Sequence, residues 1–206
     1  MIKTAAMMGV AAMCLVGCGS DPAGGGSSGN PEAKLDSQAK IEGFLEGKEL
    51  VMAGDDIPTH PNGYARDVNF AQATQCYVEV NMQLQGSNFD VKSKLGTLED
   101  APNSGDVGSC DMQTVSNELE FASTSYVVEN VEGDAECFDF TVTYPGFGQE
   151  GRGAISADRG ELLLEIFFKD QGTGIRCGDG LPGAGGITLN GMPFDGDAVQ
   201  VYAISE

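Results

Sequence analysis

Residues 76–84 alternate between apolar and polar side chains, and this period of two restricts the segment to a half-buried β-strand. Its apolar positions are Cys76, Val78, Val80, Met82 and Leu84. Gly86-Ser87-Asn88 follows and predicts a turn, because small and polar residues between two apolar runs are typical of a hairpin. The next alternating positions, Phe89, Val91 and Leu95, predict the second strand of that hairpin.

The same pattern predicts further hairpins in the second half of the chain. They are expected at 118–131 with 135–144, turning at 132–134, and at 147–156 with 161–168, turning at 157–160; late strands are expected near 187–190 and 197–204. Polar or glycine-rich segments at 99–117 and 170–186 are predicted to be loops. Before the first strand, Leu35, Ile41, Phe44 and Leu45 gather toward one face of a short predicted helix at 35–46.

Successive hairpins without helical patterns between them predict an all-β fold with one short N-terminal helix. We expect an antiparallel meander of about 8–9 strands, each paired with its neighbour in sequence, closed as a small barrel, with a β-sandwich as the alternative. Residues 161–168 are apolar on both faces, so we expect one face inside the barrel and the other under the helix. Such an interior is either filled by its own side chains, which we expect here, or holds one small ligand.

The rhythm of the hairpins resembles the up-and-down barrels of lipocalin-like domains. Residues 151–158, GRGAISAD, followed by the apolar run 162–166, are similar to the late hairpins of those barrels, and residues 45–48 stand where a barrel opening would lie. The chain contains no tryptophan and so lacks the opening signature of true lipocalins. The resemblance implies a barrel and, as an alternative function, carriage of a small apolar ligand.

The first residues predict export. Lys3 precedes an apolar run from Ala5 to Val16, which is too short to span a bilayer and is typical of a signal peptide. The run ends in Leu15-Val16-Gly17-Cys18, which resembles the lipobox of bacterial lipoproteins. The resemblance implies cleavage by signal peptidase II before Cys18 and acylation of that cysteine by chains such as palmitate. An ordinary secretory signal with another cleavage site is the alternative.

Three regions follow from this interpretation: a signal peptide at 1–17, a lipidated cysteine with a flexible Gly/Ser tether at 18–34, and a single β-barrel-like domain at 35–206. Gly19 and Ser20 follow the cysteine, and neither is the acidic residue typical of inner-membrane retention. We therefore expect a lipid anchor in the outer membrane, on either its periplasmic or its surface face.

Four cysteines remain once Cys14 leaves with the signal and Cys18 takes the lipid. They are Cys76, Cys110, Cys137 and Cys177. An even number of cysteines in an exported protein predicts disulfides, here two, with three connectivities open and the pairing of neighbours preferred. A metal site is the alternative, but the chain has no C-x-x-C pair and only one histidine, His60.

Charge limits the partners that the domain can bind. The chain has 31 acidic and 11 basic residues and a formal net charge of −20. Nucleic acid is excluded, because binding it requires basic residues, and an anionic membrane surface would repel the domain. Divalent cations or a basic partner remain, as does a simple role of the charge in solubility. The candidate calcium ligands lie beside glycines, a pattern that is also typical of turns: Asp55, Asp56, Asp179, Asp195 and Asp197.

No catalytic residue and no cofactor are predicted. His60 lies between prolines on an expected turn, and no serine or cysteine has the local signature of a nucleophile. We expect a non-enzymatic binding or structural component of a cell-envelope assembly, with an envelope protein as partner and an apolar surface patch to bind it. The alternatives are a lipocalin-like carrier, which needs a cavity on the order of a few hundred Å³, and an envelope-acting hydrolase, which needs a cleft with converging carboxylates.

Overall fold

The computed structural model describes residues 33–53, 77–97, 111–189, 191–193 and 199–206. Within these ranges the chain forms strands, two short 3-10 turns and one short α-helix. The helix is α1 (Gln38–Leu45), and the strands are β1 (Glu49–Ala53), β2 (Tyr77–Gln85), β3 (Asn88–Leu95), β4 (Asn117–Ala122), β5 (Ser125–Glu132), β6 (Cys137–Tyr144), β7 (Phe147–Ile155), β8 (Glu161–Phe168), β9 (Thr188–Leu189), β10 (Met192–Pro193) and β11 (Gln200–Ser205). The 3-10 turns are η4 (Lys169–Gln171) and η5 (Cys177–Asp179). No helix in the described part of the chain is long and apolar enough to cross a membrane.

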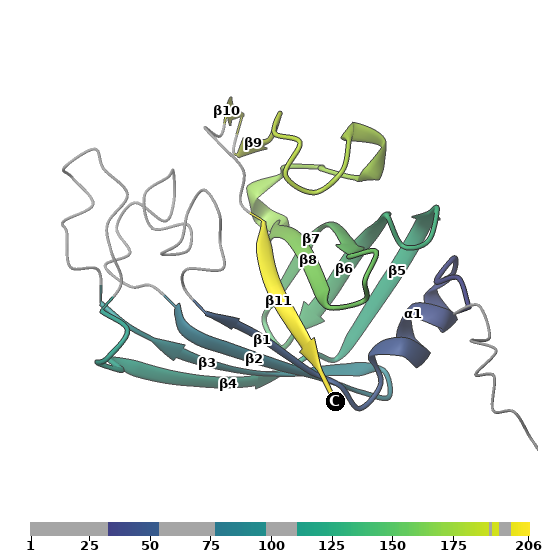
Figure 1. The fold of residues 1–206 in the computed structure, drawn as a ribbon. Helices are drawn as coiled ribbons and strands as arrows, with labels where there is room; N and C mark the ends of the chain where they lie inside the picture. Colours follow the sequence, from purple (N-terminus) through teal and green to yellow (C-terminus); the bar gives the residue numbers. More distant parts are fainter. Residues whose placement is uncertain (1–32, 54–76, 98–110, 190, 194–198) are drawn as a thin grey trace, which may run out of the picture. The chain divides into compact units, whose positions relative to one another are not determined.

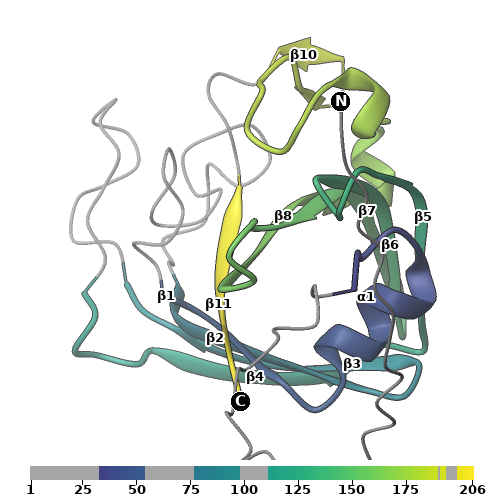
Figure 2. The ribbon, with the colours of Figure 1, turned by 45° about the vertical axis from the view of Figure 1, so that its right-hand side comes forward.

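Nine strands form one antiparallel sheet in the order β4-β3-β2-β1-β11-β8-β7-β6-β5, while β9 and β10 pair separately. The sheet curls into a half-barrel, which Figure 2 shows nearly end-on. The predicted all-β class, the antiparallel meander and the single short helix are therefore confirmed. The hairpins β2–β3 and β7–β8 lie close to their predicted positions. The side-chain alternation of β2 and β3 matches their observed burial, whereas β8 is buried on both faces from Leu164 to Phe167.

The last strand departs from the expected pairing of sequence neighbours. β11 lies between β1 and β8, with Leu50 opposite Ile204 on one side and Leu162 opposite Tyr202 on the other. It thereby joins two meanders, β1–β4 and β5–β8 (Figure 1). The prediction that every strand pairs with its neighbour in sequence was wrong here. The pairing of β11 with β1 joins segments more than a hundred residues apart, and no local pattern in the sequence reports it. Strand β1 was also not predicted.

The single strand predicted over 118–131 was wrong as well, because the segment breaks after Ala122 into β4 and β5. Ser123 donates its N–H to Phe89 O at 2.8 Å, whereas Thr124 donates to Thr143 O at 2.7 Å. Two consecutive residues thus bond to β3 and β6, strands from the two opposite ends of the sheet order. β4 and β5 are the edge strands, and the half-barrel is not closed by pairing between them.

The concave face of the sheet holds the main core, and α1 contributes to it. Ile41 and Leu45 of the helix are buried in the same cluster as Phe89, Phe140 and Leu164 from the sheet. Figure 2 shows α1 beside β5 on the inner side of the curl. The expectation that this helix covers the outer face of residues 161–168 was therefore wrong. An amphipathic helix packs where apolar area is open to it, and the open end of the half-barrel offers that area.

The outer face of β7 and β8 is covered instead by the predicted glycine-rich loop, 170–186, which bonds to the sheet through the Gly180 carbonyl and Cys177. Ile175 and Cys177 of this loop and Ile187 just after it are buried, as are Phe167 and Val199, and we call these five side chains the second apolar layer. This layer lies outside the main core cluster. Because this layer covers one face of β8 and the main core covers the other, β8 is apolar on both faces, as is usual for strands buried on both sides.

Two glycines on the concave side of β7 allow close packing. A Cβ on Gly151 would lie 2.0 Å from the backbone oxygen of Glu165, and a Cβ on Gly153 would lie 2.6 Å from the Phe138 ring. Both distances are far inside van der Waals contact, so only glycine fits at these positions.

Candidate binding surface

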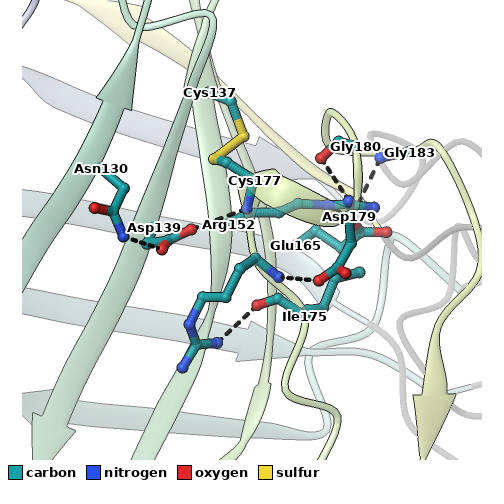
Figure 3. The surroundings of a disulfide bond; sticks show 11 residues. Asn130, Cys137, Asp139, Arg152, Glu165, Ile175, Cys177, Asp179, Gly180 and Gly183 are labelled. Carbon is teal, nitrogen blue, oxygen red and sulfur yellow. Dashed lines mark hydrogen bonds and ion pairs between the residues drawn. A yellow bond between two sulfur atoms is a disulfide. The ribbon is translucent and has the colours of Figure 1, made fainter.

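Most of the residues that the sequence singled out lie outside the described ranges. These are the lipidation candidate Cys18, the cysteines Cys76 and Cys110, His60, and the calcium candidates Asp55, Asp56, Asp195 and Asp197. Cys137, Cys177 and Asp179 are described, and all three belong to the region where the glycine-rich loop covers β6, β7 and β8 (Figure 3).

Cys137 and Cys177 form a disulfide with a Cα–Cα distance of 5.7 Å. It is one of the two bonds of the preferred connectivity, and it links β6 to the first residue of η5. Asp139 supports the same contact, because one of its carboxylate oxygens accepts the Cys177 N–H at 2.9 Å and the other accepts the Asn130 side chain at 2.8 Å. The disulfide and this carboxylate together hold the loop against the sheet (Figure 3).

A buried ion pair lies under the same loop. Arg152 donates from Nε to Glu165 Oε2 at 2.6 Å, and both side chains are 0% exposed. Arg152 also donates from Nη1 to the Gly180 carbonyl, while the Gly183 N–H reaches Glu165 Oε2 at 3.4 Å. Among the described residues, Arg152 Nη2 and Glu165 Oε1 have no hydrogen-bond partner. These charges face each other in the interior, so they connect the loop to the sheet rather than line a cleft.

Asp179 acts as a local cap in this structure. Its Oδ2 accepts the Arg176 N–H at 2.9 Å, which closes the turn of η5. Within the ranges described above, no three histidine, cysteine or acidic side chains gather as a metal site would require. The calcium interpretation of the other four aspartates falls outside those ranges and stays a prediction.

The interior of the half-barrel is packed where α1 meets the sheet. The space between them has a volume of about 10 Å³, on the scale of one water molecule. It is lined by Ile41, Glu42, Leu45, Leu84, Phe89, Tyr126, Val128, Phe138, Phe140, Leu162 and Leu164. Burial, with the Glu42 carboxylate nearby, raises the pKa of Tyr126. In this part of the chain, side chains rather than an open pocket occupy the concave face.

An aromatic rim, defined here as Phe121, Tyr144, Phe147 and Phe168, lies between β4 and the ends of β6, β7 and β8. The ring centre of Phe121 lies 5.1 Å from that of Tyr144 and 6.0 Å from that of Phe147. The ring centres of Phe147 and Phe168 are 5.6 Å apart, and all three contacts are edge-on. Tyr144 is buried, which raises the pKa of its hydroxyl to about 12, whereas Phe147 is 38% exposed. The alternating positions of these residues were visible in the sequence, but their gathering was not.

The two edge strands differ in what covers them. Along β5, the helix α1 approaches the edge, and the Gln38 side chain accepts the Val128 N–H at 3.3 Å. Along β4, no strand or helix in the described part of the chain pairs with the outer edge. The residues of β4 are exposed apart from Phe121, which is half-buried. We call this outer side of β4 the free edge.

The two faces of β4 present different chemistry beside the free edge. Leu119 is opposite Ser93 and Phe121 is opposite Val91, and both β3 partners are buried on the concave side. Leu119 itself is 42% exposed. Glu118 and Glu120 point to the convex face, because successive side chains of a strand alternate. The free edge thus combines accessible backbone, an apolar row on one face and an acidic row on the other.

This arrangement suits the binding of an extended chain. No functional residue along β4 was singled out from the sequence, because an edge strand has the same side-chain alternation as any other strand. Its position at the edge is visible only in the tertiary structure. No protein-family model, curated protein or solved structure matches this chain.

Proposed function

We propose that the protein is an outer-membrane lipoprotein that acts as a non-enzymatic binding or structural component of a cell-envelope assembly. Its acylated Cys18 anchors it, the tether at 18–34 spaces it from the lipid, and the β-domain presents the free edge to an envelope protein. The anchor part of the proposal is supported by Leu15-Val16-Gly17-Cys18 after a short apolar run.

The observation that carries the binding role is the free edge of β4, which no described element pairs with, together with exposed Leu119 and the adjoining aromatic rim. Proteins blunt or cover their sheet edges, because unpaired strands associate with other chains. Within the described ranges, α1 covers the β5 edge and no element pairs with the outer edge of β4. An apolar row that stays accessible next to an open edge supports a site for a partner.

The cavity volume and the buried charges favour this role over the two alternatives. A carrier needs a pocket on the order of a few hundred Å³, and the space beneath α1 measures about 10 Å³. A hydrolase needs charged groups that face a cleft, and the innermost charges in the described residues, Arg152 and Glu165, face each other at 0% exposure.

The anchor is tested by Cys18→Ser, with membrane and soluble fractions compared in intact cells. We expect the wild-type protein in the outer-membrane fraction and the variant in the soluble periplasmic fraction. Intact mass of the wild-type protein should show acyl chains on the N-terminal cysteine. Unchanged fractionation of the variant, or an unmodified N-terminus in the wild type, would contradict the lipid anchor.

The binding role is tested with a photo-crosslinking amino acid at Leu119 in intact cells. Val127 on β5 is the matched control, because it is 40% exposed, against 42% for Leu119, but lies on the covered edge strand. We expect one discrete envelope protein crosslinked from position 119 and not from position 127. Equal capture from both positions, or none from 119, would reject the β4 surface as the binding site.

A further inference from the structure

We propose that the free edge of β4 binds its partner by strand addition, and that the added segment is an extended, basic stretch of a protein in which lysine or arginine alternates with apolar residues. This inference rests on the proposed function and specifies the chemistry of the partner. Three features of the described residues carry it: the direction of the backbone groups of β4, the order of charges across the strands, and the apolar row on the concave face.

The backbone of β4 is oriented to accept another strand. Ser123, the residue after β4, donates its N–H to Phe89 O of β3. Backbone direction alternates along an antiparallel strand, so Asn117, Leu119 and Phe121 also direct their backbone groups to β3. This alternation leaves Glu118, Glu120 and Ala122 directed to the free edge. The Glu118 N–H donates to the side chain of its neighbour Asn117 at 3.0 Å, which is consistent with a backbone group that does not pair with β3. No described strand pairs with the backbone groups of Glu120 and Ala122 on this side, so they can bond to an incoming strand.

Charges on the convex face alternate in sign from one strand to the next. Glu79 of β2 is opposite Lys94 of β3, which is opposite Glu118 of β4. Lys94 Nζ lies 2.7 Å from Glu79, and the Glu79 carboxylate holds the pKa of Lys94 above its usual range.

The neighbouring row ends in the same sign. Lys92 of β3 is opposite Glu120 of β4, and their charged atoms are 3.4 Å apart. Both rows therefore end in an exposed carboxylate at the free edge. Opposite charges on directly facing residues stabilise strand pairing, so the next strand is expected to carry basic residues on this face.

The concave face sets the other half of the pattern. Leu119 and Phe121 form the last apolar row of the sheet, and the aromatic rim continues it toward β7 and β8. A strand added beside them would cover Leu119 with its inward side chains. Because side chains alternate, a segment that is basic on the convex side and apolar on the concave side has a period of two.

A second copy of this chain is a poorer occupant of the same edge. Pairing β4 with β4 of another copy would bring glutamates opposite glutamates, and like charges in direct opposition destabilise a sheet. The net charge of −20 adds repulsion between whole molecules. The acidic row therefore selects against self-association and in favour of a basic strand.

The test uses the purified full chain in non-ionic detergent micelles and a fluorescein-labelled ten-residue peptide in which valine alternates with lysine. Fluorescence anisotropy measures binding at several salt concentrations. One control peptide replaces each lysine with glutamate, and another carries N-methyl groups on alternate backbone amides. We expect saturable binding of the basic peptide that weakens with added salt, and none for either control, because strand pairing needs both the charge and the free amides.

Variants of β4 separate the backbone from the charge. Glu120→Pro removes a backbone donor on the free edge without removing a bond to β3, and we expect affinity to fall about ten-fold or more. Glu118→Gln and Glu120→Gln should each weaken binding about two- to five-fold. Glu129→Gln on β5 is the matched charge control and should leave affinity unchanged. Thermal unfolding of each variant checks that the domain remains folded, and the Gln variants retain the test if the proline variant does not fold.

Amide hydrogen exchange adds a direct readout: the peptide should slow exchange at Glu120 and Ala122. Absence of saturable binding, equal binding of the acidic or N-methylated peptide, or full affinity in a folded Glu120→Pro variant would each overturn strand addition. If a partner still crosslinks at position 119 under those results, the proposed function stands and only the strand model fails. If the peptide binds as expected but nothing crosslinks in cells, the assembly role fails instead.

Discussion

Removing the charge of Arg152 should destabilise the domain more than most single substitutions. In Arg152→Met, the fully buried Glu165 carboxylate loses its ion pair, and among the described residues it keeps a hydrogen bond from the Gly183 N–H at 3.4 Å. The Gly180 carbonyl also loses its donor. Breaking a buried ion pair by removing one partner costs about 3–5 kcal/mol. Because small domains are stable by about 5–15 kcal/mol in total, the free energy of unfolding should fall by a large fraction.

Replacing both members should recover most of that loss. In the double variant Arg152→Met, Glu165→Leu, no charge is left without a partner, and the apolar layer around Phe167 and Ile175 can extend over the site. Substituting both partners of a buried pair by apolar residues is often neutral or stabilising by about 1–4 kcal/mol. We therefore expect the double variant to be more stable than Arg152→Met and close to the wild type.

Urea unfolding with the disulfide intact measures these differences as shifts of the midpoint at constant slope. The control is Lys40→Met, which breaks an ion pair with Asp36 whose side chains are 48% and 47% exposed. Exposed pairs contribute about 0–1 kcal/mol, so this variant should change little. The argument fails if Arg152→Met costs less than about 1 kcal/mol, or if the double variant is no more stable than Arg152→Met.

Three further changes test the packing, the covalent link and the pH dependence. Gly151→Ala places a Cβ 2.0 Å from a backbone oxygen of β8, so it should lower the free energy of unfolding in urea by about 1–3 kcal/mol or more. The control Gly43→Ala, on the exposed side of α1, meets nothing within 4 Å and should stabilise by about 0.5–1 kcal/mol. A Gly151→Ala variant more stable than Gly43→Ala would contradict the packing of β7. Replacing Cys137 and Cys177 together by serine opens a link of sequence separation 40 and should lower the free energy of unfolding by about 4 kcal/mol, and an unchanged urea midpoint would show that the link is not formed. A guanidinium hydrogen bond, with a backbone N–H, holds the pKa of Asp134 below its usual range, so its contribution to stability is full above the unfolded carboxyl pKa and is lost as pH falls through the lowered value. Asp134→Asn should therefore flatten the acid side of the stability curve below about pH 4, measured by thermal unfolding against pH, and an acid side as steep as in the wild type would assign it to other carboxylates.

Local patterns in the sequence predicted the elements whose partners lie nearby. The alternation at 76–84 and the turn after it predicted β2 and β3, and the turn around Asp158 predicted β7 and β8. Period two reports that one face of a strand is buried and a short turn reports that the next strand returns, so both signals are available within about twenty residues. The short helix at the start of the domain was predicted for the same reason, since its apolar spacing is local.

The candidate binding surface was hidden from that reasoning. A strand at an edge and a strand in the middle of a sheet share the same alternation, so nothing near Leu119 in the sequence marks β4 as open. The break between Ser123 and Thr124 depends on two acceptors, one in β3 and one in β6, that belong to distant segments. Their positions exist only once the sheet has curled.

The sequence by itself determined the β class, the hairpins with short turns, the acidic character and the short helix, because each depends on residues close together in the chain. Only the tertiary structure decided that β11 joins the two meanders, and that the glycine-rich loop covers one face of β8 while α1 fills the concave side. It also decided that β4 is an edge strand with no pairing partner on its outer side among the described elements. Those features arise from competition between distant segments for the same apolar area and the same backbone partners, and such competition has no local signature.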